Sequence, residues 1–198
     1  MKKLTLFAIA ILSLSSLSAQ DAKSLLNDVS AKARSYDNIQ ISFKYNLNNA
    51  KENVNQDARG DVTLSGDHYI LNMMGTTRIF DGKKIYSIVP EDEEVTISNY
   101  NAQEDKEITP SKMLTFYEKG YTYKMDIVQN INGRKIQYVK LTPIDSNTEI
   151  NHVLLGIDIN TKHIYNLIEV GANKTKTTLT VNSFKTNEPL SKTLFTFD

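Results

Sequence analysis

The residues most often used for catalysis or metal binding are dispersed along this chain of 198 residues. Its three histidines, His68, His152 and His163, lie in different predicted strands and lack the spacing of metal ligands. The acidic run at residues 91–94 lies in a turn region, where a solvated loop is the first interpretation and a calcium site is the alternative. No nucleophile elbow, zinc-protease motif or glycine-rich nucleotide-binding motif is present. We therefore expect no enzymatic activity, no bound metal and no cofactor.

The remaining chemistry is that of large apolar side chains that alternate with polar ones. Flexible or flat groups are frequent among those expected to face inward: Phe43, Tyr45, Tyr69, Met73, Tyr86 and Met113. Such side chains can repack around a variable ligand. Two interpretations stay open at this point, an ordinary packed core and a cavity that holds an acyl chain.

The alternating segments predict antiparallel strands. Residues 60–90 read as consecutive strands with Asp81-Gly82 as a hairpin turn, and Asn132-Gly133 marks a second hairpin. Further strands are expected at 38–48, 94–99, 121–129, 134–142, 150–158, 163–170, 174–185 and 194–197, and a polar loop at 48–56. About eleven strands with short connections predict a mainly β fold, a barrel or strongly curved sheet that closes or nearly closes on itself.

Two helices are expected to cover this sheet. Residues 21–35 carry Leu25, Leu26 and Val29 at helical spacing, with charges on the other side. A second, short helix is expected to begin at Thr109-Pro110 and to end at Gly120. It is apolar for a surface helix, and such a segment covers an apolar opening or plugs a core.

The first nineteen residues have the layout of a secretory signal. Lys2 and Lys3 precede an apolar run at 4–14 and a small-residue exit, so we expect residues 1–19 to be cleaved; the alternative is a retained membrane anchor. Residues 20–198 have no linker or internal repeat, which predicts a single domain.

The composition limits the cellular compartment and the classes of partner that we expect. The chain has no cysteine, so it cannot carry the lipid of a bacterial lipoprotein, and export would leave it soluble in the periplasm. Basic and acidic residues are equal in number, 23 of each, and loss of Lys2 and Lys3 makes the remainder slightly acidic. Nucleic acid, which requires a basic stripe, is therefore not an expected partner.

Several segments occur in an order and spacing that resemble one protein family. They are NIQISFKY after the first helix, GDVTL, FDGKKIYSIVPEDEEVTI, TPSKML, the LTP at 141–143, LLGIDIN and the late LFTF. Together they resemble the periplasmic outer-membrane lipoprotein carrier proteins, the LolA family. The resemblance implies an incomplete antiparallel barrel of about eleven strands with a helical lid over an apolar cavity.

The resemblance also implies a function and its partners. Such a protein binds acylated lipoproteins released by an inner-membrane ABC-type complex and delivers them, as a monomer, to an outer-membrane acceptor. The acceptor of that system is itself a lipoprotein, so the missing cysteine favours the carrier role for this chain. The alternatives are a binding protein for another lipid or hydrophobic ligand, and an interaction protein with a filled core.

The resemblance further assigns roles to individual positions. The acyl-chain cavity would be lined by Phe43, Leu64, Leu71, Met73, Tyr86 and Ile88. The lid would contribute Met113, Leu114 and Phe116, and Tyr69 would be a rim aromatic facing the release complex. The family often has an arginine-proline pair after the strand corresponding to 60–65, where this chain reads Ser65-Gly66-Asp67. The arginine that helps to hold the lid closed has no match there.

Overall fold

The computed structural model describes residues 19–100 and 110–197. Nearly all of the predicted signal peptide, at 1–19, lies outside these residues, as does the predicted helix start at Thr109. Within the described ranges no helix is both long enough and apolar enough to cross a membrane.

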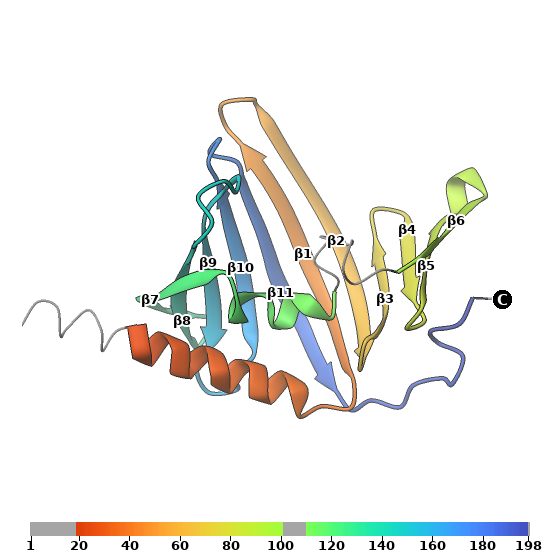
Figure 1. Cartoon of the computed structure of the whole chain (residues 1–198), viewed down its shortest axis with the longest axis horizontal. Coiled ribbons are helices and arrows are strands. Elements are labelled where there is room, and N and C mark those ends of the chain that lie inside the picture. The colour runs from red at the N-terminus through yellow and green to blue at the C-terminus, as the bar shows by residue number, and fades with distance from the viewer. Residues whose placement is uncertain (1–18, 101–109, 198) are drawn as a thin grey trace, which may run out of the picture.

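The described strands form one antiparallel sheet of eleven strands (Figure 1). Their bounds are β1 Ile39–Asn49, β2 Val54–Ser65, β3 His68–Met73, β4 Thr76–Phe80, β5 Lys84–Val89, β6 Glu94–Asn99, β7 Tyr121–Ile131, β8 Arg134–Pro143, β9 Ile150–Asp158, β10 Ile164–Gly171 and β11 Lys176–Thr186. The order across the sheet is β6-β5-β4-β3-β2-β1-β11-β10-β9-β8-β7. Strands β6 and β7 are the two edges, so the sheet curves without closing, and the predicted incomplete antiparallel barrel is confirmed.

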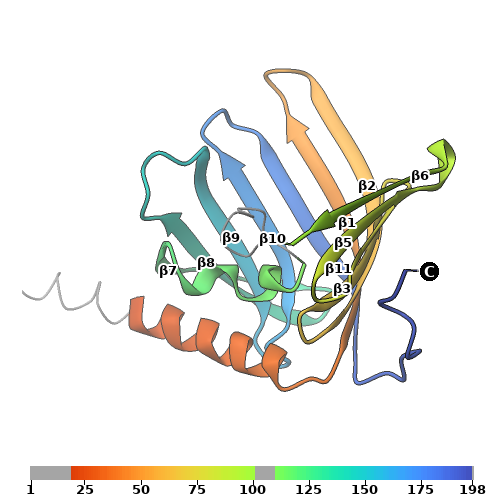
Figure 2. The same cartoon turned by 45° about the vertical axis from the view of Figure 1, so that its right-hand side comes forward.

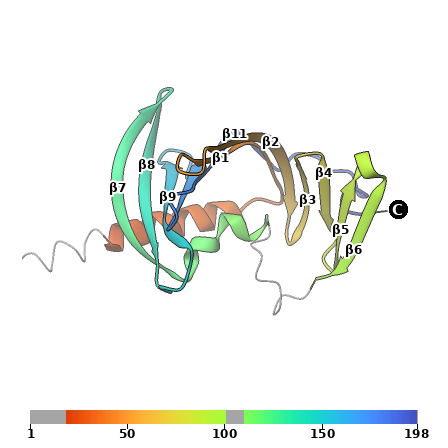
Figure 3. The same ribbon diagram turned by 90° about the horizontal axis from the view of Figure 1, so that it is seen from above.

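The curvature is visible when the molecule is seen from above (Figure 3). Strands β1 and β2 pair so that Ile41 lies opposite Val62 and Phe43 lies opposite Gly60. A Cβ atom at Gly60 would lie 2.6 Å from the Phe43 ring and 2.7 Å from the Asn72 backbone oxygen. The ring of Phe43 therefore fills the place of a missing side chain on the concave face of the sheet.

A helix at residues 19–34 lies across one end of the concave face (Figures 1 and 2). Its apolar stripe includes Ala22, Leu26 and Val29, which are buried against the sheet. Burial of each large side chain of this kind contributes about 1.5–3 kcal/mol. The predicted amphipathic helix is confirmed; most of its stripe packs on β8–β10, and Ala33 near its end packs against apolar residues of β1–β5.

The second predicted helix is wrong in type. The described part of that region forms two short 3-10 turns, η2 Lys112–Leu114 and η3 Phe116–Glu118. Thr115 between them has φ −139° and ψ 4°, which interrupts a continuous helix. Helices shorter than about twelve residues gain little from propensity alone. We call residues 110–120 the covering segment.

Three strand predictions also need correction. Strand β4 precedes the predicted Asp81-Gly82 hairpin, but alternation did not define its bounds, because adjacent Ile79 and Phe80 are both buried. Residues 194–197 do not form a strand; they run along the convex face, where Phe195 contacts the ring of His68 and Phe197 stacks on Tyr86. At β3 and β5 the sheet therefore has apolar contacts on its convex face, with the terminal segment, as well as on its concave face. Separately, β2 begins at Val54, inside the expected polar loop.

Candidate functional site

The concave face carries two apolar clusters of different density. The helix-side core joins the N-terminal helix to β8, β9 and β10 and contains Val139, Leu141 and Leu155, each with an exposed fraction of 0%. The groove-side cluster lies on β1–β5 and contains Ile41, Phe43 and Leu64, which are 5–8% exposed. Side chains around the groove-side cluster are only partly buried, which points to unfilled space beside it.

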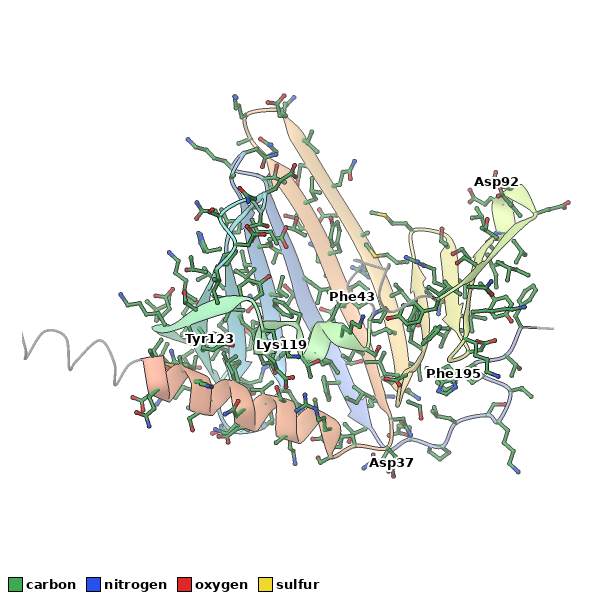
Figure 4. The ribbon with its side chains drawn as sticks, viewed as in Figure 1. Asp37, Phe43, Asp92, Lys119, Tyr123 and Phe195 are labelled. Atoms are coloured by element: carbon green, nitrogen blue, oxygen red, sulfur yellow. The ribbon has the colours of Figure 1, made fainter. Side chains whose placement is uncertain are left out.

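An apolar cavity of about 110 Å³ lies between this cluster and the covering segment. Its lining combines β1, β2, β3, β10 and β11 with the covering segment: Ile41, Phe43, Val62, Leu64, Leu71, Pro110, Met113, Leu114, Ile164, Leu167, Leu179, Val181 and Phe184. Figure 4 shows Phe43 on β1 beside the covering segment. Every one of these side chains is apolar, so the cavity offers shape and hydrophobicity and no reactive group.

Two further spaces adjoin this cavity, because each shares lining residues with it. One, of about 150 Å³, shares Met113, Leu167 and Leu179 with the cavity and extends toward Tyr45 and the covering segment's Phe116. The other, of about 360 Å³, shares Leu64 and Leu114 but is lined in part by charged side chains such as Arg34, Asp37 and Asp67, and it opens at the base of the molecule. We call the central cavity and the space of about 150 Å³ together the groove, and Met113 lies at the boundary between them.

The covering segment is fastened to the N-terminal helix by polar contacts. The buried hydroxyls of Ser30 and Tyr117 are hydrogen-bonded at 3.0 Å. The Tyr123 hydroxyl donates to the Tyr117 backbone oxygen at 2.7 Å, and Arg34 forms an ion pair with Glu118. Although the family's usual arginine has no match near residue 65, another arginine here holds the covering segment.

The pKa values of these groups follow from their surroundings. Burial raises the pKa of Tyr117 to about 12, because the phenolate would lie in an apolar environment. Burial also raises the pKa of Glu118, but hydrogen bonds from Arg34 and Ser30 and the arginine charge outweigh it, and the net pKa is lowered. The segment is therefore held by a neutral hydroxyl pair and an ionised carboxylate.

The structure brings together most of the residues that the resemblance assigned. Phe43, Leu64 and Leu71 line the central cavity, with Met113 and Leu114 across from them. Phe116 lines the neighbouring space of about 150 Å³. Met73 packs against the groove-side cluster without lining the groove.

Tyr86 and Ile88 do not lie in the groove, and that prediction is corrected. Phe80 pairs with Ile85, so Ile85 shares the concave face, whereas Tyr86 and Ile88 point to the convex face. There the Tyr86 hydroxyl donates to Asp81, and its ring stacks on Phe197. Strand β5 carries apolar residues on both faces, Ile85 on one and Tyr86 and Ile88 on the other, so alternation alone did not identify the concave face.

Tyr69 is not a rim residue either. Its exposed fraction is 1%, and it pairs with Leu64 and Phe80 on the concave face. Its ring centroid lies 5.7 Å from that of Phe80. A side chain buried to this extent cannot present a surface to a partner.

Sequence reasoning missed the contribution of the C-terminal half of the chain to the groove. Leu167 on β10 and Leu179, Val181 and Phe184 on β11 supply one wall. The alternation of Leu179 and Val181 with threonine and asparagine was a usable signal. The position of this wall could not be predicted from the sequence, because it depends on the pairing of β11 with β1 across more than a hundred residues of chain.

The described ranges contain no candidate metal centre. No group of three histidine, cysteine, aspartate or glutamate side chains there is placed to hold a metal ion. His163, for example, stacks on Phe184 at a centroid distance of 4.0 Å and is hydrogen-bonded to the Tyr36 hydroxyl. Burial lowers its pKa, which is typical of a packed imidazole.

Comparison with protein families gives one match. The model of the family described as outer membrane lipoprotein carrier protein LolA matches residues 34–198, a span that includes all eleven strands. A comparison with curated proteins finds no match.

Solved structures include folds similar to this one. An uncharacterized conserved protein from Thermus thermophilus has a TM-score of 0.60 at 9% identity, over 88% of this chain and 92% of that one. LprF from Mycobacterium bovis has a TM-score of 0.52 at 12% identity, over 88% and 96%. A LolA superfamily protein from Nitrosomonas europaea has a TM-score of 0.45 at 12% identity, over 89% and 97%. The likeness to the first two is a likeness of fold alone.

Proposed function

The chain belongs to the LolA family of outer membrane lipoprotein carrier proteins, and on that premise we propose that it carries acylated lipoproteins across the periplasm. In this proposal residues 20–198 act as one carrier domain after removal of residues 1–19. The carrier accepts acyl chains from an inner-membrane ABC-type release complex and passes them to an outer-membrane acceptor. Family members are carriers and not enzymes, and we propose the same for this chain.

The observation that carries the proposal is the apolar groove beneath a separately fastened segment. Each methylene taken out of water contributes about 0.8 kcal/mol, so a long acyl chain carries on the order of 10 kcal/mol of transfer free energy. A carrier has to recover much of that free energy and still release its cargo. A groove lined by flexible side chains, with a cover that competes for the same apolar surface, meets both requirements.

We propose that the described state is a closed one, which the small volumes of its apolar spaces support. A cavity of roughly 150 Å³ lined by leucine, isoleucine and phenylalanine accommodates benzene. The central cavity and its apolar neighbour, at about 110 and 150 Å³, therefore each hold only a few carbon atoms. Entry of a full acyl chain requires Met113 to leave its position between the two spaces, and we propose that the covering segment moves as cargo enters.

The proposal is tested by matched charge insertions on the two faces of the sheet. Leu71 faces the groove from β3 and Ile88 faces outward from β5, and both are half-buried. Spheroplasts that display a labelled lipoprotein are incubated with each purified variant, and released lipoprotein is measured in the supernatant. We expect Leu71→Glu to abolish release and Ile88→Glu to retain it.

Two results would count against the proposal. Release by Leu71→Glu at the wild-type level would show that the groove does not hold the acyl chains. Release of free lipid but no lipoprotein by the wild-type protein would indicate a carrier for a different hydrophobic ligand. Mass spectrometry of the supernatant distinguishes the two kinds of cargo.

A further inference from the structure

One carboxylate lies on the apolar wall of the groove. Glu169 on β10 pairs with Val153 on β9 and with Thr177 on β11, so it lies on the concave face. It lines the space of about 150 Å³ together with Tyr121 and Leu167. The side chain is half-buried, in a position where the pattern of the sheet would favour an apolar residue.

Glu169 has no polar partner among the residues that the structure describes. Neither ion pair of the described ranges involves it, and its carboxylate accepts no hydrogen bond there. The other polar side chains that line this space, Tyr45, Tyr121 and Thr177, carry only uncharged hydroxyls. Burial raises the pKa of Glu169, and the carboxylate in turn contributes to the raised pKa of Tyr121. A partly desolvated charge without a partner is costly, and a ligand that supplies the partner removes that cost.

We propose that Glu169 selects the ligand, by binding a hydrogen-bond donor that the acyl amphiphile carries next to its chain. The donor is an amide N–H or an ammonium group. A donor to an ionised carboxylate forms a charge-assisted bond, which is stronger in a partly desolvated site than in water. A fatty acid places a second negative charge beside Glu169 and is disfavoured for the same reason.

This inference rests on the proposed function and adds an orientation to it. The space next to Glu169 borders the central cavity at Met113, Leu167 and Leu179. An acyl chain whose donor is held at Glu169 therefore extends toward Phe43 and Leu64, under the covering segment. The polar end of the cargo lies at the Glu169 end of the groove and the methyl end lies in the central cavity.

The experiment compares dodecyl ligands that differ only at the polar end. Dodecylammonium, N-methyldodecanamide, dodecanoate and methyl dodecanoate, a neutral ester without a hydrogen-bond donor, each displace a fluorescent acyl probe from the full mature protein, below their critical micelle concentrations or solubility limits. We expect the wild-type protein to bind dodecylammonium or N-methyldodecanamide roughly tenfold more tightly than dodecanoate. Stronger binding of the amide points to the acylated amino terminus of a lipoprotein, and stronger binding of the amine points to an amine-bearing lipid.

Glu169→Gln keeps the size of the side chain and removes its charge. We expect it to reduce the preference over dodecanoate to within about threefold, while methyl dodecanoate binds unchanged. The matched control is Glu91→Gln, which removes the same charge from the exposed turn η1 Pro90–Asp92 and should leave the preference intact. An unchanged preference in Glu169→Gln, with methyl dodecanoate still bound, would overturn this inference alone. Failure of every variant to bind methyl dodecanoate would overturn the carrier proposal as well.

Discussion

The two ends of the concave face differ in what covers them. The helix-side core is covered by the helix at 19–34, which supplies a continuous apolar stripe, and residues such as Leu155 are fully excluded from solvent. The groove-side cluster is covered by the covering segment, whose two 3-10 turns reach it only through a few side chains such as Met113 and Leu114. The sheet is densely packed where the helix covers it, whereas unfilled apolar space lies under the covering segment, including the place where Phe116 approaches Val153 of the helix-side core.

The largest expected effect is a loss of stability, and it is measured by replacing one leucine in the helix-side core and one in the groove wall. Leu155→Ala should destabilise the protein by about 2–5 kcal/mol, because it opens a void in a tightly packed core. Leu179→Ala, in the groove wall, should cost about 1 kcal/mol and should mainly weaken the binding of a neutral acyl probe. Urea unfolding and probe titration of both variants provide the measurement. Equal losses of stability would mean that the two ends are packed alike.

A smaller loss of stability is expected at the hydrogen bond that joins the N-terminal helix to the covering segment. Ser30→Ala leaves the buried Tyr117 hydroxyl without its partner on the helix and should cost about 1–3 kcal/mol. It should also speed the entry of an acyl probe, because the covering segment is held less firmly. Thermal unfolding and stopped-flow binding report the two quantities. Ser35→Ala, at an exposed hydroxyl near the end of the same helix, is the control and should change neither.

The smallest effect concerns pH. The pKa of Glu118 is lowered from 4.5, so its ion pair with Arg34 contributes fully above that value and is lost as the pH falls through the lowered pKa. Acyl-probe entry should therefore accelerate at low pH, by no more than about threefold since the pair is partly exposed. The probe should enter Glu118→Gln at the faster rate at every pH. A pH step that survives in this variant would assign the titration to another group.

Sequence alone predicted the class of the fold because alternation and hairpin turns are local signals. Ile39, Ile41 and Phe43 alternate with polar residues without a break, and strand β1 lies where this alternation predicts a strand. The helix-side stripe of Leu26 and Val29 was likewise readable. These features depend on residues that are close in sequence.

The groove was predicted only in part, because its walls depend on register. The faces of Tyr86 and Ile88 were predicted wrongly, because β5 carries apolar residues on both faces and its alternation does not identify the concave one. The wall formed by Leu179 and Val181 required knowledge of the pairing between β1 and β11. Glu169 was overlooked because a single carboxylate in a strand looks like an exposed residue until its neighbours are known.

The close approach at Gly60 has a consequence for the size of the cargo. The Phe43 ring rests where any larger residue at position 60 would place its side chain, and that ring is also part of the floor of the groove. A methyl group added there would displace the ring toward the central cavity. If the chain carries acyl groups as proposed, the depth of the cavity that receives them depends on the absence of one carbon atom on the neighbouring strand.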